Sequence, residues 1–497
     1  MSEVSYGRRL TLLAEERGEG TAVVFAAKAG GEAEVSWAEL ERRANQMAHA
    51  LADREVGEGD VVVVALPNSV QHLVASFGAW KRGASVLPLR YDLPSWERDR
   101  MLELAGAKVV VGDWLDAPAG TVTSADIDAS ADRDTAPPPD RVPPCARLIA
   151  TSGSTGSPKI IVTPAPGLYS YMPNAIMPTA LERSAVGAVH LTTSPLYHTN
   201  GFAGSYMPLL AGDRVVLMEK FDAARAVDLI ERHRVTHVIM VPTMLQRVAR
   251  LEGVRDRDLS SLERVLYGGA AIPEWVVRTW LELVPPERFW FSYGSSEGVG
   301  LCVMTGREWQ DHPGATGHPV DCDLKILDAA RHEVPVGEVG EIFMRPREGS
   351  GPTFTYLGSE MPEPTPDGFW SIGDMGRVDE DGFLYIADRR QDMIVSGGAN
   401  VFPAEVEAAL SEHPGVADNV VVGLPDPEWG RRVHAIVQPA DPGAPPSAEE
   451  LRAHCKQRLA AYKVPKSFEV VEALPRSAAG KVNRTALAAE RTSDTVA

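Results

Sequence analysis

One stretch of the chain combines the residue types that hold phosphate groups. The apolar run Leu148–Ala150 leads into a loop of glycines and small hydroxyl residues that ends on Lys159. Glycines let the backbone approach a ligand, successive N–H groups form a concave anion site, and a lysine adds a point charge. Pro158 stands where a Walker A loop has glycine, so this is another kind of loop. A flexible Ser/Gly linker is the alternative, but linkers rarely follow an apolar strand. The residues that we expect to contact phosphate are Thr151, Ser152, Gly153, Ser154, Thr155, Gly156 and Lys159.

A second motif, Gly294-Ser-Ser-Glu-Gly298, allows two kinds of chemistry. It matches the GxSxG elbow of α/β-hydrolases, in which Ser296 would be the nucleophile. That elbow needs a helix next, and residues 299–306 are a poor helix sequence. Alternatively, Glu297 could ligate a nucleotide-bound Mg²⁺, which takes one or two carboxylates plus substrate phosphates. Tyr293 would then offer an aromatic face beside it. The sequence favours the nucleotide site and leaves a serine hydrolase as a remote alternative.

Other polar residues stand in turns or at boundaries. The turn that ends at Asp374 could hold ribose hydroxyls, although an ordinary Asp turn has the same sequence. Asp388-Arg389 begins the last part of the chain, and the loop Pro475–Lys481 ends in a lysine among small residues. His233 and His237 have the spacing of a metal pair. The segment passes from helix to strand between them, which favours structural roles.

The composition narrows the class of protein. The 497 residues carry 49 Lys and Arg against 68 Asp and Glu, a net charge of −19. Nucleic acids and anionic membranes attract basic surfaces, so we expect neither as a partner. The four cysteines are scattered and form no CxxC motif, which favours a reducing cytoplasm and no zinc site. The longest apolar runs are strand-sized and too short to cross a bilayer.

Strand and helix patterns alternate along most of the chain, which predicts an α/β fold with parallel strands. Several predicted strands end at polar or glycine-rich corners, where ligands gather in such sheets. These corners are Ser194–Phe202, Gly268–Ala270 and Gly294–Gly298. From about residue 320 to 388, short strands with turns predict a β-rich subdomain. We therefore expect a large N-terminal domain, residues 1–388, and a small α+β domain, residues 389–497.

Taken in this order, the motifs resemble the adenylate-forming superfamily, which includes acyl-CoA synthetases, adenylation domains of nonribosomal peptide synthetases and beetle luciferases. The resemblance runs from about residue 10 to 485 and is to a stand-alone acyl-CoA synthetase. It implies that the small domain is mobile and that there are two half-reactions. A carboxylate and ATP give acyl-AMP and pyrophosphate, and a thiol then takes the acyl group. The implied cofactors are ATP and Mg²⁺, with CoA as co-substrate.

The resemblance also implies a role for each matching residue. Lys159 and its loop hold the β- and γ-phosphates, Ser296 the α-phosphate and Glu297 the Mg²⁺, while Lys481 bridges the carboxylate and the α-phosphate. The remaining nucleotide contacts are Gly268, Gly269, Ala270 and Tyr293 around the adenine, Asp374 and Arg389 at the ribose, and Gly294. The thiol tunnel is lined by Ser396, Gly397 and Gly398, and Gln391 is the hinge.

The sequence departs from the family pattern at several positions in or beside these motifs, and the usual histidine is missing from Thr163–Pro166. Ser296 replaces a threonine and keeps the hydroxyl, whereas Ile160 and Ile372 replace a usual glycine and threonine. Gln391 stands where the hinge usually has Asp or Lys, so the hinge side chain is neutral here.

The acid-binding residues are expected near His198, which stands at the usual aromatic or histidine gate and is a further catalytic candidate. Residues 196–202 lack the aspartate of amino-acid-activating members, and a buried unpaired ammonium is costly. The predicted acyl pocket consists of His198, Asn200, Gly201, Phe202, Gly298, Val299, Gly300 and Leu301. Its small residues indicate a bulky apolar acid, although they could equally serve close packing. CoA is the expected thiol, a carrier protein is the alternative, and the enzyme is expected to be a monomer or homodimer.

Overall fold

The computed structural model describes residues 3–151, 158–169, 187–347, 354–477, 480 and 482–493. Its centre is a nine-stranded sheet in the order β16-β15-β14-β13-β12-β10-β11-β2-β3. The strands from β14 to β2 are parallel, and β15, β16 and β3 are antiparallel to their neighbours. The predicted α/β fold with parallel strands is confirmed. In chain order the strands are β2 (Thr21–Ala26), β3 (Glu32–Ser36), β10 (Val189–Thr192), β11 (Arg214–Met218), β12 (His237–Met240), β13 (Arg264–Gly268), β14 (Phe289–Gly294), β15 (Leu301–Thr305) and β16 (His318–Pro319).

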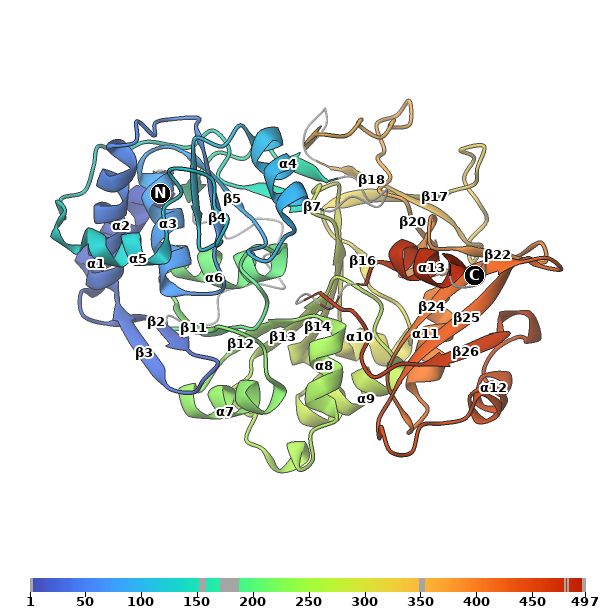
Figure 1. The fold of residues 1–497 in the computed structure, drawn as a ribbon. Helices are drawn as coiled ribbons and strands as arrows, with labels where there is room; N and C mark the ends of the chain where they lie inside the picture. The colour runs from blue at the N-terminus through green and yellow to red at the C-terminus, as the bar shows by residue number, and fades with distance from the viewer. Residues whose placement is uncertain are drawn as a thin grey trace.

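Helices cover both faces of this sheet. Figure 1 shows α6 on one face and α7, α8 and α9 on the other. Successive residues of a strand point to opposite faces, so Val215 packs in the core on the α6 side and Val216 in the core on the other. Burial on both sides explains the continuous apolar runs in the sequence. The helices are α6 (Thr199–Ala211), α7 (Ala223–His233), α8 (Pro242–Ala249), α9 (Glu274–Leu283) and the short α10 (Gly306–Asp311).

The first part of the chain forms a second layer on the α6 side. Its parallel sheet has the order β5-β4-β6, and α2 and α3 pack closely beside it. A Cβ on Gly78 of α3 would lie 2.6 Å from Met47 Cγ of α2, so glycine permits this close helix contact. The elements are α1 (Tyr6–Arg17), α2 (Trp37–Ala52), β4 (Val61–Ala65), α3 (Val70–Lys81), β5 (Ser85–Pro88), α4 (Ser95–Ala105), β6 (Val109–Gly112) and α5 (Ser124–Ala129).

Two small antiparallel sheets stand beside these layers. One has the order β19-β8-β7, in which Thr151 and Lys159 pair across a hairpin, so both ends of the predicted phosphate loop are adjacent. The other pairs β1 with β9. Their strands are β1 (Val4–Ser5), β7 (Leu148–Thr151), β8 (Lys159–Val162), β9 (Leu168–Tyr169) and β19 (Thr355–Leu357).

The predicted β-rich part forms an antiparallel sheet in the order β17-β18-β20-β21. Asp374, the first residue of β20, pairs with Arg389, the last residue of β21. The strands are β17 (Cys322–Leu327), β18 (Gly340–Pro346), β20 (Asp374–Val378) and β21 (Leu384–Arg389).

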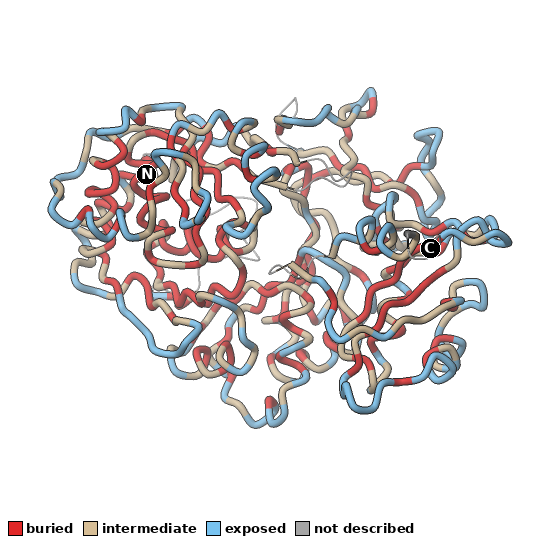
Figure 2. The backbone as a smooth tube through the Cα atoms, viewed as in Figure 1, coloured by how far each residue is buried: buried red, intermediate tan, exposed pale blue. Residues whose placement is uncertain are grey.

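The last part of the chain has cores of its own, in which Val406 and Val421 are buried. Figure 2 shows the buried chain of β24 and β25 among exposed loops. Helices and strands are mixed in this part of the chain, which agrees with the α+β character that the sequence predicts. The boundary at 388/389 remains a prediction. The elements are β22 (Ile394–Ser396), β23 (Ala399–Val401), α11 (Pro403–Ser411), β24 (Val416–Asp426), β25 (Gly430–Pro439), α12 (Ala448–Lys456), β26 (Ser467–Val470) and α13 (Arg484–Ser493). None of the described helices is both long and apolar enough to span a membrane.

Candidate active site

Polar side chains from three different sheets meet near the carboxyl end of β14. The Tyr293 hydroxyl donates a hydrogen bond of 2.8 Å to Asp374 Oδ2. The Arg389 Nε lies 3.3 Å from Asp374 Oδ1. Burial raises the pKa of Asp374, and the Arg389 charge opposes that rise. A carboxylate held in this way can accept hydrogen bonds from a diol, as the predicted ribose contact requires.

Lys159 and Glu297 lie together beside this group. The Tyr356 hydroxyl of β19 donates a 2.8 Å hydrogen bond to Glu297 Oε1. The Lys159 ammonium lies 4.0 Å from the same oxygen and 3.6 Å from the centroid of the Tyr356 ring. Burial lowers the pKa of Lys159, while the Glu297 carboxylate opposes this. The hairpin of β7 and β8 thus brings the end of the phosphate loop to the predicted Mg²⁺ ligand.

Ser296 contacts the first residue of α6. Its hydroxyl lies 3.0 Å from Thr199 Oγ1, which also accepts a 3.1 Å hydrogen bond from Arg147 Nη2. The Arg147 guanidinium stacks over the Phe202 ring at 4.4 Å. Burial lowers the pKa of Arg147 to about 9, so this side chain is still a cation at neutral pH. The Thr199 hydroxyl therefore links Ser296 to the positively charged guanidinium of Arg147.

The hydrolase alternative for Ser296 is wrong. The chain after Gly298 enters β15, which runs antiparallel to β14. The nucleophile elbow requires a strand–turn–helix, and here a strand follows the turn.

The glycine corner after β13 lies close to the start of α6. A Cβ on Gly268 would lie 2.6 Å from Ser292 Oγ, so no larger residue fits there without a shift. Gly269 has φ +98°, a conformation that favours glycine, and an added Cβ would lie 3.8 Å from Asn200 Nδ2. The predicted adenine contacts thus border the predicted acyl residues.

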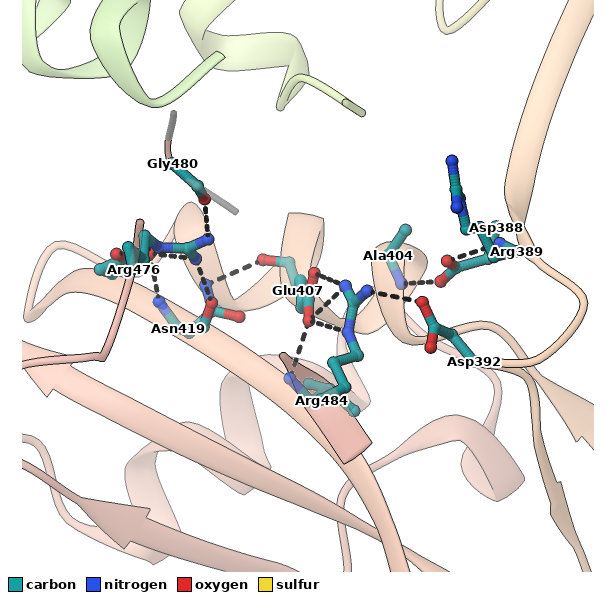
Figure 3. A network of polar contacts seen from close by, with 11 residues as sticks. Asp388, Arg389, Asp392, Ala404, Glu407, Asn419, Arg476, Gly480 and Arg484 are labelled. Atoms are coloured by element: carbon teal, nitrogen blue, oxygen red, sulfur yellow. Dashed lines mark hydrogen bonds and ion pairs between the residues drawn. The ribbon is translucent and has the colours of Figure 1, made fainter. Parts of the chain in front are cut away.

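The loop before Lys481 lies against the large domain. Arg476 Nη1 donates a 2.9 Å hydrogen bond to the Gly480 carbonyl, and Figure 3 shows Gly480 at the end of the polar network that faces the green helices. A Cβ on Gly480 would lie 2.5 Å from Thr243 Oγ1 of α8. Arg250, next to α8, donates a 2.9 Å hydrogen bond to the Val416 carbonyl of β24. Lys481 lies outside the described residues, as do Ser152, Gly153, Ser154, Thr155 and Gly156.

The turn that contains Gln391 is tied to the rest of the small domain. Asp388 accepts 2.8 Å hydrogen bonds from the backbone N–H groups of Arg389 and Ala404 (Figure 3). Burial raises the pKa of Asp388 to about 6. Arg484 contacts both Glu407, at 2.8 Å, and Asp392, at 3.1 Å. Gln391 itself is exposed.

The predicted thiol-tunnel residues lie away from this site. Ser396 ends β22, and Gly397 and Gly398 form the β22–β23 turn with φ +58° and +81°. Figure 1 shows β22 on the side of the small domain remote from the central sheet. Their role remains a prediction, because it requires another arrangement of the two domains.

Two of the eight predicted acyl residues, Phe202 and Val299, are buried in different cores. Phe202 is buried against Trp80 and Tyr206, and Val299 is buried in a different core. An added Cβ would lie 2.0 Å from the Pro195 carbonyl oxygen at Gly201 and 2.6 Å from Cys322 Sγ at Gly300. Close packing therefore explains these two glycines. Asn200 and Leu301 lie beside the glycines Gly269 and Gly294. His198, Asn200, Gly298 and Leu301 remain predicted acid contacts.

Sequence reasoning missed Tyr356, Arg147 and Thr199. Tyr356 lies in a three-residue strand without a recognisable motif, and Thr199 is an ordinary first residue of a helix. Arg147 offered one signal, a charge directly before the apolar run of the phosphate loop.

The residues present fit a nucleotide-bound magnesium ion. Mg²⁺ in such sites takes one or two carboxylates and completes its shell with phosphates and water. Glu297 is a largely buried carboxylate, and its neighbour Ser296 has its hydroxyl 3.0 Å from Thr199 Oγ1. No cluster of three or more His, Cys, Asp or Glu suited to a metal occurs among the described residues, so an ion here would depend on substrate phosphates.

Fold and site together define a nucleotide-binding α/β enzyme with a small second domain. Residues 12–351 match the family described as AMP-binding enzyme, and residues 405–481 match the AMP-binding enzyme C-terminal domain. The chain belongs to this family. It is 35% identical over 484 residues to a feruloyl-CoA synthase from an Amycolatopsis species, covering 92% of this chain and 94% of that one. It is 32% identical over 478 residues to a fatty acid–[acyl-carrier-protein] ligase from Streptomyces coeruleorubidus, covering 91% of each.

A solved structure supports the same assignment. The o-succinylbenzoate CoA synthetase from Bacillus subtilis, bound to its acyl-adenylate, has a TM-score of 0.82 and 28% identity, with 98% of each chain covered. The same protein with ATP and a magnesium ion has a TM-score of 0.81, covering 97% of this chain and 99% of that one. The predicted class, an AMP-forming acid–thiol ligase that uses ATP and Mg²⁺, is confirmed.

Proposed function

We propose that this enzyme activates an aromatic carboxylic acid with ATP and transfers the acyl group to CoA. The observation that carries the proposal is the meeting of Lys159, Glu297, Asp374 and Arg389 beside the Ser296–Thr199 pair. This group joins cations for phosphates, a carboxylate for ribose and a carboxylate for Mg²⁺. Two related proteins are named for aromatic acids, ferulic and o-succinylbenzoic acid, which favours an aromatic substrate.

In the first half-reaction an oxygen of the carboxylate attacks the α-phosphorus of ATP. The bond from that phosphorus to the bridging oxygen of pyrophosphate breaks, and pyrophosphate leaves with the electron pair. Lys159 and its loop hold the leaving group, Asp374 and Arg389 hold the ribose, and Lys481 neutralises the charge that develops between the two substrates. A bound Mg²⁺ on Glu297 would supply further charge neutralisation.

The position of Gly480 favours this first step. Its contact with Thr243 brings the loop before Lys481 to the large domain, next to the end of β12. The second half-reaction needs the thiol of CoA to attack the acyl carbon and release AMP. We propose that the small domain then rotates about the turn at Gln391 and presents the Ser396–Gly398 turn instead.

The acid carries no ammonium group near its carboxylate. Residues 196–202, which include the start of α6, contain no carboxylate to pair with one, and an unpaired buried ammonium is costly. The four cysteines are free and buried, which supports the prediction of a reducing cytoplasm. A monomer or homodimer remains the expectation.

A panel of acids tests this function. Purified enzyme is mixed with Mg·ATP and each acid, and pyrophosphate release is measured with and without CoA, with products read by mass. We expect acid-dependent pyrophosphate, AMP and an acyl-CoA. A carrier protein with a phosphopantetheine arm, supplied in place of CoA, tests the other acceptor. Release of ADP and phosphate, or no release with any acid, would exclude the proposal.

A further inference from the structure

The face of the central sheet that α6 covers is apolar toward the nucleotide site and polar at the amino ends of β10, β12 and β13. Its apolar cluster begins at Leu301, which pairs with Gly294 at the carboxyl end of β14, and continues to Ile239, Leu266 and Trp290, which lie in one row across the middle of the sheet. Helix α6 starts at this corner and runs back over β10, β11 and β12 (Figure 1). A Cβ on Gly204 of α6 would lie 3.6 Å from Ile239 Cδ1, in ordinary contact. An apolar strip therefore leads away from the site of adenylation.

The strip ends in a group of polar side chains at the amino ends of β10, β12 and β13. The rings of His190 and His237 stack with centroids 4.7 Å apart. Arg264 pairs in register with His237, and its guanidinium lies 5.3 Å from the Trp290 ring centroid. A small cavity is lined by His190, His237, Arg264, Gly204, Ile239 and Leu266. Polar groups thus border a cavity where a sheet core is usually apolar.

The charges in this group favour an oxygen ligand. His190 Nε2 lies 3.4 Å from Asp213 Oδ2, and this contact holds the orientation of the His190 imidazole. The His237 Nδ1 lies 2.8 Å from Thr236 Oγ1. Burial lowers the pKa of His237 to about 3, helped by the charges of His190 and Arg264, so this imidazole is neutral at physiological pH. The Arg264 guanidinium has only donors, and each imidazole carries at least one N–H, so the group is rich in donors.

We infer that the acid substrate carries an oxygen substituent at the end remote from its carboxylate, and that His190, His237 and Arg264 recognise that oxygen. The substituent is a hydroxyl, methoxy or carboxylate group on an aromatic ring. This inference rests on the proposed function and corrects the expectation of a purely apolar acid. Arg264 and Gly268 are four residues apart on β13, roughly 13 Å at the rise of a strand. That length accommodates one ring and a short linker between the reacting carboxylate and the polar end.

Pairs of acids that differ only at the far end test the inference. The probes are cinnamic acid, 4-hydroxycinnamic acid and 4-carboxycinnamic acid, with kcat/KM taken from pyrophosphate release. A site built to hydrogen-bond a substrate oxygen discriminates strongly against the analogue that lacks it, so we expect at least about a tenfold preference for an oxygenated acid. The hydroxy and carboxy acids distinguish a neutral ligand from an anionic one.

Variants assign the preference to the named side chains. His237→Leu should lower the oxygenated-to-plain ratio about tenfold and leave kcat/KM for cinnamic acid within about twofold. Arg264→Gln should lower the ratio most for the carboxy acid. His434→Leu is the matched control, because His434 is a buried histidine on a strand of the small domain. It should leave the ratio unchanged.

The outcomes separate this inference from the proposed function. Activity with cinnamic acid but no preference for an oxygenated acid in the wild type overturns the inference alone. A His237→Leu variant that loses both acids equally while its thermal midpoint is unchanged also overturns it. Absence of activity with every acid overturns the proposed function as well. If His237→Leu does not fold, the inference is still tested by the oxygenated-to-plain ratio of kcat/KM in the wild type and by the change of that ratio in Arg264→Gln.

Discussion

Tyr356→Phe removes one hydrogen bond from the predicted magnesium ligand and nothing else. The lost bond is the 2.8 Å contact to Glu297, while the ring stays under Lys159 at 3.6 Å. A hydrogen bond to a charged group contributes about 1.5–3 kcal/mol net. If that bond orients Glu297 in the transition state of adenylation, kcat/KM for Mg·ATP should fall about 10- to 150-fold.

The assay is acid-dependent pyrophosphate release at varied Mg·ATP. Thioester formation from supplied acyl-adenylate, which does not need the pyrophosphate half of ATP, should stay within about twofold. Binding of Mn²⁺ with ATP, followed by calorimetry, should weaken in parallel, which separates orientation of the carboxylate from a general loss of activity.

Tyr385→Phe is a matched control. The Tyr385 hydroxyl donates a 3.0 Å hydrogen bond to Asp379, and Arg377 lies 3.9 Å from its ring centroid, so it repeats the same arrangement away from the site. The control should keep wild-type adenylation. Equal losses in the two variants, or an unchanged Tyr356→Phe, would refute a positioning role for Tyr356.

Three further predictions follow from other parts of the molecule. Lys481→Ala should lower adenylation about 10²–10³-fold and spare thioester formation from acyl-adenylate; an equal loss in both steps would contradict its assignment. Gly480→Ala, at φ +74° and against Thr243, should slow adenylation at least about tenfold, and adding Thr243→Ala should partly restore it, as read by pyrophosphate release. Buried His72, hydrogen-bonded to Tyr206, has its pKa lowered to about 3, so the unfolded chain binds more protons below pH 6.5. That group should reduce the free energy of unfolding by about 2 kcal/mol from pH 7 to 5, and urea titration of His72→Gln should show a pH dependence weaker by that amount.

Local sequence patterns predicted the elements and several site residues. Asp374 was predicted because its carboxylate stands in a glycine turn. Glu297 was predicted because its carboxylate lies in the motif that follows a strand. The parallel sheet followed from the alternation of Val-rich runs and helical patterns. These features depend on residues that are neighbours in the chain, so they can be predicted from local sequence patterns alone.

Contacts between distant segments could not be predicted in this way. Tyr356 reaches Glu297 because β19 pairs with β8, and no local pattern encodes that pairing. Arg147 contacts Thr199 because the residue before β7 lies beside the first turn of α6, and Thr199 in turn contacts Ser296, which follows β14. For the glycines the sequence left two interpretations open, room for the acid or close packing, and close backbone and side-chain contacts explain Gly201 and Gly300. Helix α13 was missed because its short polar sequence has few apolar positions.

The most direct test of the central claim is to trap the intermediate. Enzyme, Mg·ATP and an accepted acid are incubated without CoA, quenched and analysed by mass. The proposed chemistry predicts an acyl-adenylate with an equal amount of pyrophosphate, which added CoA converts into acyl-CoA and AMP. Formation of ADP with an acyl phosphate, or cleavage of ATP only after CoA is added, would contradict it.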